Sequence, residues 1–140
     1  MAAISACRNS GVGSAATSFV SSDARGGRAA APKAALEAAQ RVAERAMTLV
    51  AADTEQSYLA NEERQLAVER LLMRFGEALK AVPPKVLDRI DPELDWSGPM
   101  RFRDLVAHWY TEGLDHRLIW RALQSDLPRA IGAIASYLKG

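Results

Sequence analysis

The sequence predicts an all-α fold, a bundle of four to five helices joined by short connections. Three observations support this fold class. Apolar residues recur at three- and four-residue steps through most of the chain after residue 32. Prolines and glycines fall between these stretches, where they end helices. No stretch alternates apolar and polar residues as a half-buried strand does. With 140 residues, the chain is long enough for one domain around one core.

Residues 1–32 differ in composition from the rest of the chain, because alanine, serine and glycine dominate and no periodicity is sustained. The glycine-containing runs at residues 10–14 and 26–32 cannot bury enough side chain to offset the entropy lost on ordering. We therefore expect a disordered, low-complexity tail, followed by a helical domain over residues 33–140. The same composition suits an organellar transit peptide or a start codon upstream of the true one. We favour the tail or the early start over targeting.

Two long helices are predicted in the first half of the domain. The first covers about residues 33–51, and the second begins at residue 58 or 61 and ends at Val82, after a break at residues 53–57. The Asn61 side chain can cap the second helix, and the Pro83–Pro84 pair ends it because neither proline donates a backbone hydrogen bond. The apolar faces that predict the two helices are Leu36, Ala39, Ala43, Ala46, Met47 and Val50, and then Val68, Leu71, Leu72, Phe75, Leu79 and Val82.

Three further helices are predicted in the second half of the domain. We expect a short helix or turn and a loop over residues 85–98, and helices over residues 99–112, 116–125 and 127–140. Pro99 suits the first position of a helix, and Gly113 suits the position just after its end. Asp115 can cap the next helix, and the sequence around Pro128 marks the last break.

Composition excludes several classes of site. No window approaches 18 uninterrupted apolar residues, so we expect no membrane span. Cys7 is the only cysteine, which leaves neither a disulfide framework nor a thiolate metal site. No cluster of ligands for a metal is visible, and we expect no metal and no cofactor. A reducing cytoplasm is the natural setting for such a chain.

The net charge is +1, but residues 33–140 carry 15 basic and 16 acidic groups. Neutralisation of phosphates by lysine and arginine supplies most of the non-specific affinity for nucleic acid. A nearly neutral domain cannot obtain this affinity from bulk charge. If RNA is a ligand, we expect a few clustered arginines to contact it.

Residues 103–110 place an arginine, an acid, a histidine and a tyrosine within one predicted helix. Arg103 and Tyr110 share one helix face, and Asp104 and His108 share another, about 120–140° away. Arg103 and His108 of one helix therefore do not converge, although two copies related by a two-fold axis would bring them into one cleft. His108 suits proton transfer near neutral pH, Arg103 suits a phosphate, and Asp104 can orient the imidazole.

Each of these residues also has an ordinary structural interpretation. His108 could be a hydrogen-bonded structural histidine, and Arg103 with Asp104 could be surface charges near a helix start. Trp109 and Trp120 are expected to be core or interface anchors rather than base-stacking residues. We expect His116 to be a surface residue. The charged residues of the second helix are expected to form a solvated face: Glu62, Glu63, Arg64, Glu69, Arg70, Arg74 and Glu77.

The spacing Arg-x4-His-x-Tyr resembles the signature of the HEPN ribonuclease superfamily, and the similarity is closest to the HepT-like toxins. The similarity continues outside the motif and covers about residues 34–139. The other matching segments are residues 58–62, Arg70, residues 75–78, Trp96, Met100, residues 115–120 and residues 126–128.

This resemblance implies a homodimeric HEPN-type bundle that cleaves RNA without a metal, with tRNA or mRNA as substrate. It further implies a toxin whose antitoxin is a minimal nucleotidyltransferase that attaches AMP to the motif tyrosine. Transferred residue by residue, Arg103 and His108 are catalytic, Asp104 supports them, and Tyr110 is the site of AMPylation. An anionic adduct on Tyr110 would compete for Arg103, which shares its face.

A second function is compatible with the same resemblance, namely a catalytically silent HEPN subunit that binds a nucleotidyltransferase partner. Departures from the family pattern support this alternative. Asp104 replaces the asparagine usual after the arginine, and Leu71 and Met73 replace an asparagine and a glutamate of the second helix.

Overall fold

The computed structural model of the chain describes residues 31–109 and 114–140, with side chains for residues 32–104 and 114–140. Its helices are α2 (Ala31–Leu49), α3 (Glu55–Leu59), α4 (Glu62–Lys80), α5 (Pro84–Ile90), α6 (Ser97–Trp109), α7 (His116–Gln124) and α8 (Asp126–Lys139). No strand occurs in these residues, and the predicted all-α class is confirmed. The tail was predicted over residues 1–32; residues 1–30 lie outside the described ranges, and residues 31 and 32 belong to α2.

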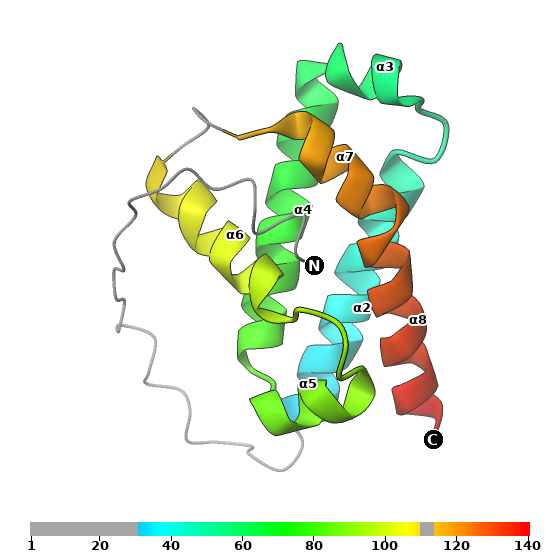
Figure 1. The fold of residues 1–140 in the computed structure, drawn as a ribbon, viewed down its shortest axis with the longest axis vertical. Helices are drawn as coiled ribbons and strands as arrows, with labels where there is room; N and C mark the ends of the chain where they lie inside the picture. The colour runs from blue at the N-terminus through cyan, green and yellow to red at the C-terminus, as the bar shows by residue number, and fades with distance from the viewer. Residues whose placement is uncertain (1–30, 110–113) are drawn as a thin grey trace.

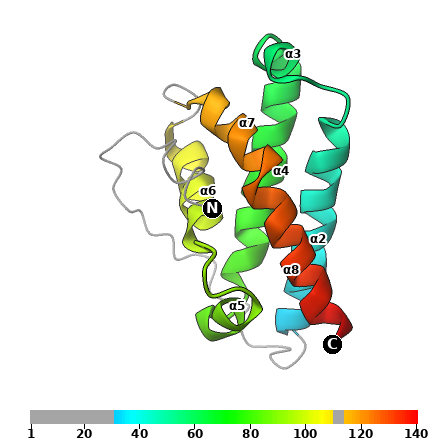
Figure 2. The same ribbon diagram turned by 45° about the vertical axis from the view of Figure 1, so that its right-hand side comes forward.

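Helix α4 occupies the centre of the bundle, with α2 on one side and α6 on the other (Figure 1). Helix α8 packs against α2 and runs antiparallel to it, and the short helix α5 lies against α8 at the lower end (Figures 1 and 2). Helix α7 contacts α3 and α8 at the upper end. Because α4 touches both α2 and α6, it determines where the side chains of both neighbours lie.

The core is continuous and follows the predicted apolar faces. Small side chains on α2 allow close approach to α4 and α8, since Ala39, Ala43 and Ala46 are fully buried. Larger side chains from the other helices fill the remaining space. The largest fully buried ones are Tyr58, Phe75, Phe102, Leu36, Leu72, Leu79, Leu87, Ile119, Leu123, Leu127 and Ile134.

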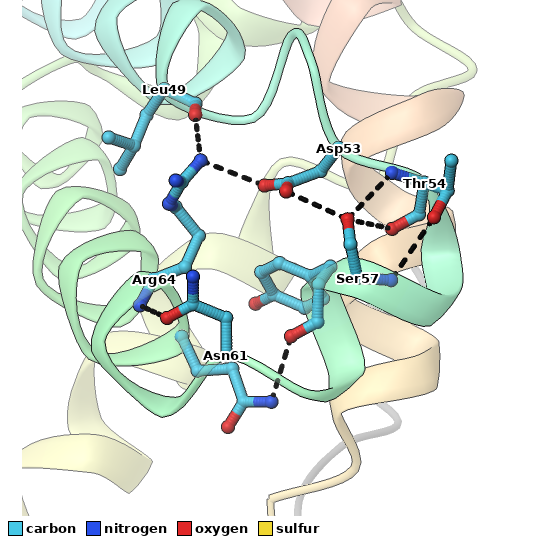
Figure 3. A network of polar contacts seen from close by, with 8 residues as sticks. Leu49, Asp53, Thr54, Ser57, Asn61 and Arg64 are labelled. Atoms are coloured by element: carbon cyan, nitrogen blue, oxygen red, sulfur yellow. Dashed lines mark hydrogen bonds and ion pairs between the residues drawn. The ribbon is translucent and has the colours of Figure 1, made fainter.

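The connection between α2 and α4 contains a helix that the sequence reasoning did not separate. Residues 53–57 were expected only to break the first helix, but Thr54 begins α3 through a reciprocal capping box with Ser57. Arg64 ties this connection to α4, because its Nη1 donates to the Leu49 carbonyl at 2.6 Å and to Asp53 at 2.9 Å (Figure 3). Asn61 accepts from the Arg64 backbone N–H, so the predicted cap of α4 is confirmed.

The later helix ends agree with the predictions to within a few residues. Asp115 caps α7 by accepting from two backbone N–H groups, as predicted. Helix α6 begins at Ser97, two residues before the predicted Pro99, because Asp95 accepts hydrogen bonds from the backbone N–H and the hydroxyl of Ser97. Pro128 lies in the first turn of α8, where its missing N–H costs no helical hydrogen bond. The expected end of α6 at Gly113 lies outside the described residues.

Candidate functional site

The start of α6 is held firmly before the motif begins. The Trp96 indole is buried and donates to the Asp91 carbonyl at 3.0 Å. The Ser97 hydroxyl donates to Asp95 at 2.6 Å and accepts from Arg101 at 2.7 Å. The hydrogen bond from Ser97 lowers the pKa of Asp95, so this carboxylate stays charged and anchors the helix. The residues that follow are therefore carried on a fixed element.

Gly76 allows α6 to cross α4 at very close range. A Cβ atom at Gly76 would lie 2.3 Å from the Pro99 carbonyl oxygen and 3.1 Å from the Arg103 Cβ. Only glycine leaves room for the backbone of a neighbouring helix at such distances. The buried Phe102 holds the other side of the crossing in the core. Close contact at Gly76 thus places Arg103 directly against α4.

Arg103 is held by two acids at the surface of this crossing. Its Nε lies 2.7 Å from the Glu77 carboxylate on α4, and its Nη1 donates to Asp104 at 2.7 Å. The hydrogen bond to Asp104 and the charge of Glu77 raise the pKa of Arg103. The side chain is 30% exposed, so a guanidinium of fixed orientation still reaches solvent.

Asp104 accepts hydrogen bonds from two cations. Lys80 at the end of α4 donates to the same oxygen as Arg103, at 3.2 Å. Partial burial alone would raise the pKa of Asp104, but the hydrogen bonds from Arg103 and Lys80 outweigh it, and the pKa lies below its usual value. Helical geometry placed Arg103 and Asp104 on different faces, yet the long arginine side chain bridges them.

The structure brings together two of the four predicted site residues, Arg103 and Asp104. His108 follows Asp104 by one turn of the α6 backbone, but its side chain lies outside the described part, and Tyr110 lies outside it entirely. Sequence reasoning missed Glu77 and Lys80 as partners of the motif. Gly76 is the sequence signal that could have indicated them, because a glycine inside a helix indicates a close approach of another segment.

A second group of titratable side chains lies where α4 meets α3 and α7. Glu69 is only 5% exposed, which contradicts its expected place on a solvated face. His116 Nε2 lies 3.6 Å from Glu69, and the imidazole packs edge-on against the buried Tyr58. Its side chain is 23% exposed, so the histidine expected at the surface is partly buried. Glu69 and His116 lie in helices as expected, but contacts between the helices determine how far each side chain is buried.

Burial shifts the pKa values of Glu69 and His116 in the directions that favour the neutral form of each side chain. Desolvation raises the pKa of Glu69. Desolvation lowers the pKa of His116, against the opposing charge of Asp115. Attraction between a charged Glu69 and a charged His116 would offset part of this cost. Trp120 stacks at a tilt on Tyr58 and is nearly buried, as expected of a core anchor.

Two other classes of site can be checked on residues 31–109 and 114–140. Among the side chains described, those of residues 32–104 and 114–140, no three His, Cys, Asp or Glu gather in a way that could hold a metal ion. Within the same residues, no helix is long and apolar enough to cross a membrane. The polar groups that gather at the α4–α6 crossing therefore form the strongest candidate site.

Most of the chain is similar to known proteins. A family model described as "Ribonuclease HepT-like" matches residues 35–136. A protein of Thermococcus cleftensis named "Probable ribonuclease HepT" is 35% identical over 77 residues, which are 55% of this chain and 68% of that protein. A protein of Methanocaldococcus jannaschii named "Putative RNase MJ0127" is 32% identical over 82 residues, which are 59% of this chain and 66% of that protein. No solved structure gives a significant match.

Proposed function

The chain belongs to the HepT-like ribonuclease family, and from this premise we propose that it is a metal-independent endoribonuclease that uses Arg103 and His108. The observation that carries the proposal is the guanidinium of Arg103. Glu77 and Asp104 hold it in one orientation, and it stays partly exposed in the helix that also carries His108. A pre-oriented cation at the surface suits the recognition of a phosphodiester.

The proposed reaction is transesterification of RNA. His108 accepts the proton of a ribose 2′-hydroxyl, and the 2′-oxygen attacks the adjacent phosphorus. A P–O2′ bond forms, the P–O5′ bond breaks, and a proton is delivered to the leaving 5′-oxygen. The products are a cyclic 2′,3′-phosphate and a free 5′-hydroxyl. Neither electrons nor a metal ion are needed to balance this step.

Arg103 stabilises the charge that builds on the non-bridging phosphate oxygens. A guanidinium has five N–H donors, and the contacts with Glu77 and Asp104 use Nε and Nη1. No bond of Nη2 is found among the described residues, so this group is available to the phosphate. Asp104 and Glu77 have a second effect, because their negative charge limits how strongly a phosphate binds before the reaction. Arg103 is thereby suited to charge that develops in the transition state.

We further propose that the active form is a homodimer in the cytoplasm. Arg103 and His108 are five residues apart, a spacing that corresponds to different faces of a helix, so one cleft containing both would be built from two copies of α6. In the same proposal, the protein is a toxin whose antitoxin is a minimal nucleotidyltransferase. That partner would silence it by attaching AMP to Tyr110, which follows Arg103 by seven residues in the sequence.

The first experiment compares cleavage of tRNA and total RNA by the wild-type protein and by His108→Ala, in EDTA. We expect wild type to cut and His108→Ala to lose cleavage by two orders of magnitude or more, as general acid–base catalysts do. His116→Gln is the matched control, because the chain has only two histidines. It should retain cleavage, provided that a thermal melt shows it folded. Analysis of the ends should find cyclic phosphates.

Two results would contradict the proposal. If His108→Ala cuts as fast as wild type, the histidine has no catalytic role. If folded, dimeric wild type does not cut, intact mass decides between two explanations. An added AMP on wild type that is missing from Tyr110→Phe supports a silenced toxin. Unmodified, inactive protein supports the second candidate, a silent subunit that binds a nucleotidyltransferase, which the unusual acid at Asp104 favours.

A further inference from the structure

An open groove of about 1050 Å³ runs between α2 and α4, outside the candidate site. Four arginines line it, two from each helix. Arg41 and Arg45 come from α2, and Arg70 and Arg74 come from α4. Glu44 is the one acid among the lining residues, and it accepts a hydrogen bond from Gln40. The groove is therefore strongly basic, although the domain as a whole is nearly neutral.

The arginines of the groove differ from most other arginines of the fold in having no acid partner. Arg64, Arg101, Arg103 and Arg129 each form an ion pair with an aspartate or glutamate. For the four groove arginines, the described residues provide neither an ion pair nor a side-chain hydrogen bond. Their guanidinium groups thus keep all of their donors available to a ligand.

This arrangement is unfavourable for the fold by itself. Residues four apart lie on the same side of a helix, so Arg41 and Arg45 form one like-charge pair and Arg70 and Arg74 form another. Each such pair destabilises a helix slightly, and facing the two pairs across a groove adds repulsion. An anionic ligand would remove both costs. The geometry therefore indicates a binding surface rather than a stabilising feature.

The ligand that fits best is a chain of repeated negative charges. Successive arginines on each helix are about 6 Å apart along the axis, so both sides of the groove present charge at regular steps. Leu71 and Leu49 contribute apolar surface between them, against which sugars and bases can lie. A flexible single strand can follow such a row of cations, and its bases tolerate an apolar wall.

The groove and the candidate site share helix α4. Arg70, Arg74 and Glu77 lie within about 60° of one another around its axis, and Glu77 holds Arg103 of α6. A strand in the groove would therefore continue along α4 toward Arg103. We propose that the groove binds the phosphodiester backbone of the single-stranded RNA that is cleaved at Arg103. This inference rests on the proposed ribonuclease function and adds the surface that holds the substrate.

The test measures binding of a fluorescent single-stranded RNA whose 2′-hydroxyls are methylated, which prevents cleavage by transesterification. The variant Arg70→Gln/Arg74→Gln removes two charges from the groove and keeps good helix formers. The matched control is Arg117→Gln/Arg121→Gln, which removes two exposed arginines, also four residues apart, from α7 outside the groove. Thermal melts accompany both, and removal of a like-charge pair should not lower stability.

We expect the groove variant to bind on the order of tenfold more weakly at moderate salt and the control to stay within about twofold of wild type. The slope of log affinity against log salt should become shallower by about 1.4 in the groove variant, or about 0.7 for each lost contact. Should the α4 variant fail to fold, Arg41→Gln/Arg45→Gln tests the opposite wall. Where wild type cleaves RNA, the loss should appear mainly in KM.

Binding is measured without cleavage, so the groove and the proposed catalysis can fail separately. An inactive wild type that carries no added AMP and still binds RNA through the groove would refute the catalytic proposal only. Unchanged RNA affinity in the folded groove variant would overturn the groove proposal. If that variant keeps its RNA affinity but no longer binds a nucleotidyltransferase partner, the groove is a protein interface, and the groove proposal is likewise overturned.

Discussion

The two flanks of α4 differ in whether their charged side chains have partners of opposite charge. On the flank facing α6 and α7, Gly76 permits a close crossing, and the charges that result are paired or buried. On the flank facing α2, four arginines around an open groove form no ion pair with any described residue, although Glu44 also lines the groove. Glu69 and Arg70 are neighbours in sequence, yet the first is buried and the second is exposed.

If both proposals hold, one helix both builds the site and supplies the surface that holds its substrate. Ion pairs fix the direction of a side chain, and a cation that must meet a phosphate at one place benefits from this. Unpaired arginines are less ordered but keep their attraction for any phosphate that passes. The paired flank is therefore suited to positioning and the unpaired flank to capture.

The largest expected effect comes from breaking the close crossing with Gly76→Ala. The added Cβ would overlap the Pro99 carbonyl, and neither helix can yield without moving its backbone. We expect the free energy of unfolding to fall by about 2 kcal/mol, since overpacking a tight contact outweighs the gain in helix propensity. Urea denaturation measures this change, and RNA cleavage should fall with it because Arg103 shifts away from α4.

Gly132→Ala provides the control for that experiment. Gly132 is exposed in α8, and a Cβ there would meet nothing within 4 Å. This variant should therefore gain about 0.5–1 kcal/mol from helix propensity. If Gly76→Ala and Gly132→Ala change the free energy of unfolding equally, the crossing of α4 and α6 is not tight. The account of how Arg103 is positioned would then be wrong.

The sequence was sufficient to predict the features that depend on neighbours along the chain. The caps at Asn61 and Asp115 and the buried stripes of α2 and α4 follow from local patterns. Helix α3 was missed because its capping box is followed by a single turn, which gives no periodic stripe.

The features that depend on contact between helices were not predictable in the same way. Charge placed Glu69 on a solvated face, but α3 and α7 cover it. The motif Arg103–Asp104 was recognised as a candidate, whereas its partners Glu77 and Lys80 required knowledge of where α6 crosses α4. If RNA is a ligand, the nearly neutral domain predicts contact through a few clustered arginines. Which arginines cluster could not be predicted, because Arg41, Arg45, Arg70 and Arg74 come together only through the packing of α2 and α4.

A smaller effect is expected from the buried carboxyl of Glu69. Because its pKa is raised in the folded protein, it contributes full stability below its ordinary pKa and loses that stability as pH rises through the folded value. Glu69→Gln removes this titration. The variant should therefore become more stable relative to wild type as pH rises above about 4, the ordinary pKa of glutamate, in urea denaturation at each pH.

His116→Gln tests the other member of the pair with the opposite sign. The pKa of His116 is lowered by burial, so its contribution is complete above the ordinary pKa of histidine and is lost as pH falls through the folded value. This variant should become more stable relative to wild type as pH falls, not as pH rises. Parallel pH profiles for the two variants would show that burial does not govern these titrations.

The smallest expected effect on stability, and the finest test of the comparison, comes from Glu77→Gln. The substitution removes one acid partner of Arg103, and the Glu77 side chain is 53% exposed, so the free energy of unfolding should change by no more than about 0.5 kcal/mol. Arg103 would then keep Asp104 as its one acid partner among the described residues and come closer to the unpaired arginines of the groove. We expect tighter binding of methylated RNA and a salt slope steeper by up to about 0.7, the value for one added contact.

Glu37→Gln removes the same charge from an exposed position on α2 and serves as the control. Beyond the effect of net charge, it should change neither the affinity for methylated RNA nor the slope of log affinity against log salt. Tighter RNA binding by Glu77→Gln together with slower cleavage would separate the two uses of an arginine. Without Glu77, the guanidinium of Arg103 would bind phosphate more tightly but hold it in a less defined position. The reason is that Glu77 orients Arg103, whereas Arg74 has no such partner among the described residues. Weaker binding by Glu77→Gln would instead show that the acid supports the phosphate site, and the contrast between the two flanks would not extend to function.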